Sequence, residues 1–149
     1  MNARALELGE IQGNVIAGFN TDIQVLIALT NPTPASFEAA ARWISQRADD
    51  VTVVSEVRAG RSAIQASGSK VTWLGLAVGG RLLQWMQVTI NDNAFKGGMV
   101  KRAPSILNDA TDPQAWKVGS PSAPVDVFLI VASNDESAAV QALRLPVSR

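Results

Sequence analysis

Residues 125–132, Val-Asp-Val-Phe-Leu-Ile-Val-Ala, are the strongest strand signal in the chain. The run is short, apolar and rich in β-branched residues, and Pro124 precedes it. Such a run, bounded by turn signals, is typical of a buried strand. Asn134 or Asp135 then supplies a capping side chain, so we predict a closing helix that continues to about Leu143.

The same reasoning predicts three earlier strands, at residues 22–30, 51–57 and 71–77. Between the first two, Thr33 and Pro34 are typical of a helix start, because a hydroxyl can cap the helix and proline suits its first turn. Apolar residues follow at helical spacing, which predicts a helix to about residue 48: Phe37, Ala40, Ala41, Ile44 and Ala48.

The segments between the predicted strands are less regular. Residues 59–70 are rich in Gly, Ser and Ala, and we predict a mobile loop there. A short helix is expected at 81–86. Asn91 and Asp92 are expected to cap a helical turn that Gly97-Gly98 interrupts and that resumes over 99–107.

The predicted order is β-α-β-β-α-β with additions, which is the ferredoxin-like arrangement. The fold class is therefore α+β, an antiparallel sheet with helices on one face. No composition shift or linker divides the chain, so we expect residues 1–149 to form a single domain.

Composition excludes several classes of function. The chain is 47% hydrophobic and balances 13 basic against 13 acidic residues, without a block of like charges, so we expect no nucleic-acid partner. No apolar run approaches the length of a membrane span, and residues 1–7 lack the apolar segment of a signal peptide. We expect a soluble, cytoplasmic protein without membrane contact.

The chain contains no histidine, cysteine or tyrosine. Serine–histidine and cysteine–histidine catalysis and zinc sites built from histidine and cysteine are therefore impossible. The usual axial ligands of haem iron are also missing. Met86 and Met99 are conceivable ligands, but core packing is the prediction for both, as it is for three tryptophans: Trp43, Trp73 and Trp85.

Several short motifs give a resemblance when they are taken in order. The opening is Glu10-Ile-Gln-Gly-Asn-Val15, and the strand and turn at 71–83 follow it. Later matches are Phe95, Gly98-Met99, Arg102-Ala103, Leu107-Asn108-Asp109, Pro113 and Trp116. This series resembles the amino-terminal half of the dye-decolourising peroxidases, with Asn108 where that family usually has glycine. The resemblance covers roughly residues 6–145.

The resemblance implies that this chain corresponds to the first of two ferredoxin-like halves. In that family the haem lies mainly in the second half, with its proximal histidine and distal arginine. The distal aspartate belongs to a Gly-x-x-Asp-Gly motif, which does not surround Asp126 here. No catalytic, cofactor-binding or metal-binding residue therefore transfers to this chain, which we expect to bind no cofactor alone.

These points lead to the hypothesis of a split, hetero-oligomeric haem peroxidase. A second chain would carry the haem and the catalytic groups, and the isolated chain would be inactive. Predicted partner contacts come from the opening motif and the irregular region: Ile11, Gln12, Gly13, Asn14, Phe95, Met99 and Arg102. Turns and core packing within the chain are the competing interpretation of these residues.

Two other functions remain open at the level of sequence. The chain could form a haem-free homo-oligomer, in which two sheets pack into a barrel-like dimer that binds a small molecule. It could also be a structural or docking subunit of a peroxidase that never contacts substrate.

Overall fold

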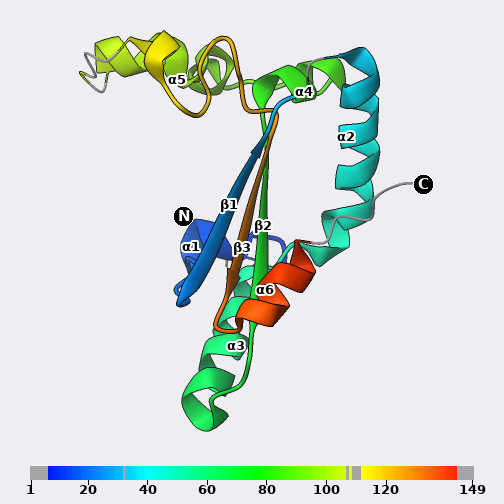
Figure 1. The fold of residues 1–149 in the computed structure, drawn as a ribbon, viewed down its shortest axis with the longest axis vertical. Helices are drawn as coiled ribbons and strands as arrows, with labels where there is room; N and C mark the ends of the chain where they lie inside the picture. The colour runs from blue at the N-terminus through cyan, green and yellow to red at the C-terminus, as the bar shows by residue number, and fades with distance from the viewer. Residues whose placement is uncertain (1–6, 32, 107, 109–111, 144–149) are drawn as a thin grey trace, which may run out of the picture. The chain divides into compact units, whose positions relative to one another are not determined.

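The computed structural model describes residues 7–31, 33–106, 108 and 112–143. Three strands form one sheet in the order β1-β3-β2, so the last strand is central (Figure 1). The elements in chain order are α1 (Gly13–Ile16), β1 (Ile23–Leu29), α2 (Pro34–Arg47), η1 (Ala48–Asp50), α3 (Val54–Ser67), β2 (Thr72–Val78), α4 (Gly80–Trp85), α5 (Asn93–Ile106), η2 (Pro113–Ala115), β3 (Val127–Ser133) and α6 (Glu136–Ala142).

The α+β class and the antiparallel sheet are confirmed. The backbone N–H of Asp126 donates to the Leu29 carbonyl at 2.8 Å, and that of Gly79 donates to the Asp126 carbonyl at 2.7 Å. The start of β3 therefore lies beside the ends of both neighbours, as antiparallel pairing requires. The strands predicted at 22–30, 71–77 and 125–132 are present within a few residues.

The helix predictions hold with small shifts in their boundaries. The helices expected after Pro34, near residue 81 and after Asp135 are α2, α4 and α6. Predictions that involve Leu107, Asp109 and residues 144–145 lie outside the described residues. In the described ranges, no helix combines the length and hydrophobicity that crossing a bilayer requires.

The strand predicted at 51–57 and the loop predicted at 59–70 are wrong, because α3 occupies residues 54–67. The Glu56 carboxylate accepts the backbone N–H of Val53 at 2.9 Å and caps the first turn. Gly68 ends the helix at φ 64°, in the left-handed conformation that favours glycine. Capping at both ends thus outweighs the strand preference of the valines at its start.

A trace of the predicted strand survives just before α3. The backbone N–H of Thr52 donates to the Leu74 carbonyl at 2.9 Å, and the Thr52 hydroxyl accepts the Leu74 N–H at 2.9 Å. On its other side, the backbone carbonyl of Thr52 accepts the N–H of Gly13 at 2.8 Å. A short extended segment therefore joins the amino-terminal motif to β2, although no fourth strand forms in the described ranges.

Contacts divide the chain into two compact units, and each strand contributes residues to both. The first unit comprises residues 1–27, 47–76 and 129–149, and the second comprises 28–46 and 77–128. One hydrophobic cluster in the core of the first unit joins four buried residues, Phe19, Val57, Trp73 and Ala132. The Phe19 and Trp73 rings lie 5.8 Å apart in a tilted arrangement. Core packing of Trp73 is therefore confirmed.

Both faces of the central strand β3 carry buried residues. Ala132 packs with the core of the first unit, and Ile130 contacts it from the same face. Leu129 and Val131 point to the opposite face, because side chains alternate along a strand, and they are at most 2% exposed. Burial on two faces explains why this stretch is apolar without alternation.

The Gln12-Gly13 dipeptide makes contacts within the first unit. The Gln12 amide donates to the Leu76 carbonyl at 2.9 Å and accepts the Leu76 N–H at 3.1 Å, so it pairs like an added strand residue on β2. A Cβ atom at Gly13 would lie 2.4 Å from Cγ2 of the buried Val57 and 2.9 Å from the Phe19 ring. Only glycine allows this close approach.

We expect Gly13→Ala to lower the free energy of unfolding by about 1–3 kcal/mol, because the added methyl overpacks a rigid core. Urea denaturation of the purified chain measures this loss. Gly9→Ala is the matched control, since nothing lies within 4 Å of its added Cβ. Equal stability of both variants would contradict the packing described at Gly13.

Asp135 begins α6 and pairs with Lys70. Its carboxylate accepts the N–H of Ala138 at 2.8 Å, and the Lys70 ammonium contacts its other oxygen. The hydrogen bond from Lys70 holds the pKa of Asp135 below its ordinary value of 3.8, and the bond from Ala138 acts in the same direction. This interaction therefore favours the folded state when the carboxyl is ionised.

A lowered carboxyl pKa gives stability that is complete above the unfolded pKa and is lost as the pH falls through the folded one. We expect the chain to lose stability below about pH 4. Asp135→Asn should reduce the slope of that loss, because asparagine still caps the helix but does not titrate. Thermal unfolding across a pH series checks this, and parallel profiles for both proteins would refute it.

Candidate functional site

Exposed apolar side chains gather in the second unit around a groove of about 1180 Å³. We call this surface the α4–α5 groove. Apolar residues dominate its lining, with polar and charged groups among them. The lining residues used below are Arg81, Val88, Phe95, Lys96, Met99 and Arg102. The groove is open, because Phe95 is 45% and Met99 is 55% exposed.

Backbone geometry shapes the groove. A Cβ at Gly79 would lie 2.2 Å from the Val125 carbonyl oxygen, so glycine lets α4 begin against the segment before β3. The Asp92 carboxylate accepts the N–H of Phe95 at 2.7 Å and caps the first turn of α5. Gly98, at φ 64° and ψ 174°, then breaks α5, as the sequence predicted. The break places Phe95 and Met99 in the lining of one groove.

The structure divides the predicted contact residues into two groups. Phe95, Met99 and Arg102 all line the α4–α5 groove. The segment 11–14 belongs to the first unit. There Gly13 is buried and Gln12 pairs with β2, so their observed contacts are internal. A partner contact through any of these residues stays a prediction.

An ion pair between a buried carboxylate and a half-exposed arginine lies beside the groove, and sequence reasoning missed it. Asp126 is completely buried, and its carboxylate lies 3.0 Å from Nε of Arg81 and 3.1 Å from an Nη atom. The backbone N–H of Asn31 donates to the same carboxylate at 2.7 Å. A buried carboxylate needs such partners. The available signal was a charged residue at the start of an otherwise apolar strand.

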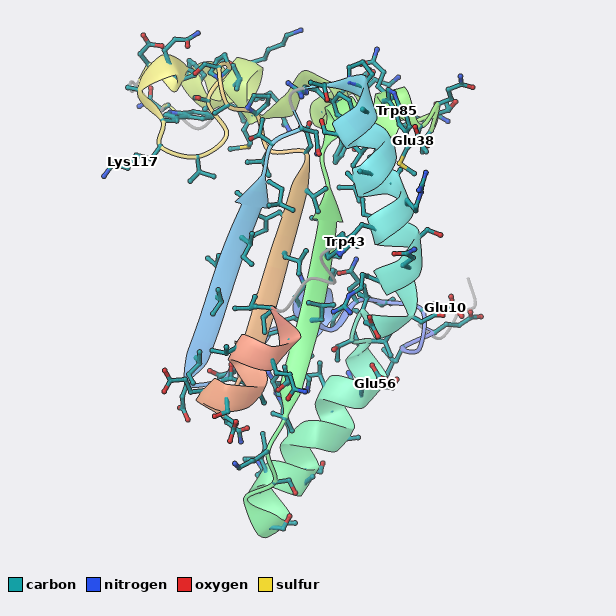
Figure 2. The ribbon with its side chains drawn as sticks, turned by 45° about the vertical axis from the view of Figure 1, so that its right-hand side comes forward. Glu10, Glu38, Trp43, Glu56, Trp85 and Lys117 are labelled. Carbon is teal, nitrogen blue, oxygen red and sulfur yellow. The ribbon has the colours of Figure 1, made fainter. Side chains whose placement is uncertain are left out.

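Aromatic rings extend this cluster on the side of α2. The Arg81 guanidinium lies 5.3 Å from the centroid of the Phe37 ring, a cation–π distance. Phe37 stacks on Trp85 with ring centroids 6.1 Å apart. Figure 2 labels Trp85 on α4. Trp85 is 41% exposed, so the prediction that it packs in the core is wrong.

The methionine predictions are also wrong. Met86 is 39% exposed and Met99 is 55% exposed, so neither fills a core. Met86 directly follows α4, a helix of only six residues, and Met99 lies at the break in α5. Short and broken helices leave these side chains without a complete apolar surface to cover them.

No protein-family model and no curated protein matches the sequence. Solved structures do match its fold. A DyP-type peroxidase from Anabaena sp. superposes with a TM-score of 0.73 at 18% identity, over 91% of this chain and 30% of that protein. An ancestral D-type dye-decolorizing peroxidase gives a TM-score of 0.69 at 17% identity, over 93% and 30%.

This chain has the fold of one part of a dye-decolourising peroxidase. A third similar structure, a dye-decolorizing peroxidase whose heme pocket has been engineered, gives a TM-score of 0.69 at 23% identity. The match covers 93% of this chain but only 29% of that peroxidase. The resemblance seen in the sequence is thus confirmed as a likeness of fold, and the chain spans less than a third of these peroxidases.

The residues of this peroxidase-like fold do not fit a haem iron. The chain offers no imidazole, thiolate or phenolate. Its candidate sulfur ligands, Met86 and Met99, are well exposed to solvent. Among the described residues, no group of three histidine, cysteine, aspartate or glutamate side chains could hold a metal ion. We therefore derive no catalytic step through haem on this chain alone.

We expect Arg81→Met to lower the free energy of unfolding by about 2–4 kcal/mol, because it leaves the Asp126 carboxylate buried without a counter-ion. Adding Asp126→Asn to this variant should restore part of the loss, since the uncompensated charge is then gone. Urea unfolding of the single and double variants measures both effects.

Arg42→Met is the matched control for the loss of an ion pair. Arg42 pairs with Glu38 at 2.8 Å, but both side chains are more than 60% exposed. Loss of this exposed pair should cost about 0.5 kcal/mol or less. Equal costs for Arg42→Met and Arg81→Met would contradict a special role for the buried pair.

Proposed function

We propose that this chain is the part of a DyP-type peroxidase assembly that does not ligate haem. A second chain would carry the haem and the groups that react with hydrogen peroxide. One observation carries the proposal: almost all of this chain matches, but it matches only about 30% of each peroxidase. The remaining 70% or so of such an enzyme has no counterpart in these residues.

The chemistry of the chain supports the same division of roles. Peroxide cleavage by a haem enzyme needs an axial ligand that tunes the iron and an acid–base group near the peroxide. Without histidine, cysteine or tyrosine, this chain lacks the usual ligands. The chain has a packed core and an exposed apolar groove. Such a groove suits a subunit that supports a catalytic partner.

To test this, the chain is tagged, expressed in the cells from which the sequence derives, and purified under mild conditions. We expect it to retain a longer, histidine-containing polypeptide, and the complex to show haem absorbance and peroxide-dependent oxidation of a dye. After denaturation and refolding alone, the tagged chain should show neither. Absorbance spectra and turnover assays measure both states.

Two outcomes would overturn the proposal. One is a tagged chain that is stable, colourless and without a haem-carrying partner in its native cells. The other is a refolded chain that by itself binds haem and turns over peroxide. Light scattering on the refolded chain tests the alternative function, a haem-free homo-oligomer. That alternative requires a stable dimer without any partner.

A further inference from the structure

We propose that the α4–α5 groove is the surface on which the haem-carrying polypeptide docks, through an apolar segment flanked by carboxylates. This inference rests on the proposed function and names the surface and the chemistry of the contact. Three features of the groove carry it: its exposed apolar side chains, its cations, which form no ion pair within the part of the chain that the structure describes, and the helix cap that its acidic residue forms.

The apolar part of the groove is unusually open for side chains of this size. Val88 and Phe95 are each 45% exposed and Met99 is 55% exposed, and all three line the same concave surface. Exposed apolar residues that are scattered singly need no explanation, but a contiguous set in a groove marks an interaction site. Phenylalanine and methionine are also enriched at protein interfaces.

The charged part of the groove is positive. Lys96 and Arg102 line it, and within the described ranges neither forms an ion pair with another residue. Arg81 also lines the groove, but its charge is balanced by Asp126. The sequence of α5 contains Lys96, Lys101 and Arg102 and no acidic residue. The groove therefore complements a partner that carries carboxylates.

The acidic residue of the groove, Asp92, caps a helix and forms no ion pair with these cations among the described residues. Asp92 lines the groove, but its carboxylate accepts the N–H of Phe95 at 2.7 Å as the cap of α5. No salt bridge links Asp92 to Lys96 or Arg102 among the described residues. The cations thus remain available to an incoming carboxylate, and the cap keeps the first turn of α5 in place.

The positive charge of the groove also favours an acidic protein partner over a second copy of this chain. In a two-fold symmetric contact the same patch meets itself, so a second copy of this chain would bring a positively charged groove against an identical one. Like charges in contact oppose association. A small ligand would need a more enclosed site, because pockets bury most of a ligand's surface and this groove leaves its apolar residues about half exposed.

The test compares the haem retained per tagged chain in variants purified from native cells. The groove variants are Met99→Asp, which places a charge in the apolar contact, and Arg102→Glu, which reverses one cation. Each should reduce the haem-to-chain ratio roughly tenfold or more, as expected for central interface residues. The haem content is measured by absorbance after extraction.

The matched controls lie in the first unit. Val140→Asp makes the same kind of change at an apolar residue that is 51% exposed on α6. Arg58→Glu reverses an exposed cation on α3. Both should keep the haem-to-chain ratio within about twofold of the unmodified chain, because isolated surface substitutions have small effects. Circular dichroism verifies that all four variants fold.

The outcomes separate this inference from the proposed function. If the unmodified chain retains haem and the groove variants retain as much, the groove is not the docking surface, although the proposed function stands. If the unmodified chain retains no haem, the proposed function itself fails. A dimer of the isolated chain that dissociates in the groove variants would overturn the assignment of the partner.

A second measurement covers the case in which a groove variant does not fold. Hydrogen exchange of the unmodified chain is compared before and after its partner is removed. Backbone amides of residues 87–102 should exchange more slowly in the complex, since docking covers them. Unchanged exchange in this segment, together with protection elsewhere, would also overturn the inference.

Discussion

The buried carboxylate of Asp126 is the constraint on which the second unit depends. A charge withdrawn from water must be compensated, and Asp126 obtains this from the Arg81 guanidinium and the Asn31 backbone N–H. These partners come from the start of α4 and from the segment after β1. One side chain therefore fixes how three separate segments meet, while Gly79 allows their backbones to approach closely.

The same ion pair reaches the neighbouring α4–α5 groove, because Arg81 lines it. Arg81 is held by its carboxylate and by the ring of Phe37, so it anchors one wall of the groove. The residues of α5 that line the groove lie on both sides of the break at Gly98. Two of their apolar side chains, Phe95 and Met99, are about half exposed. Exposed apolar residues that share one groove are typical of an interaction surface.

The likeness to dye-decolourising peroxidases sets these local features in a known fold. It rests on fold alone, at 17–23% identity, and it covers less than a third of those enzymes. The sequence contains none of the usual axial ligands of haem iron among histidine, cysteine and tyrosine. The proposed role beside a catalytic partner would reconcile the shared fold with the missing iron ligands.

The sequence by itself determined the α+β class, three of the strands, the caps of α2, α5 and α6 and the lack of iron ligands, because apolar runs, capping residues and composition are local properties. It also placed Phe95, Met99 and Arg102 together as candidates, through motif order. Only the tertiary structure decided that residues 54–67 are helical, since Val54 and Val57, which favour a strand, are completely buried on one side of this helix. Tertiary structure likewise decided which apolar residues are exposed and that Asp126 forms an ion pair with Arg81. Burial and ion pairing both depend on segments that are distant along the chain.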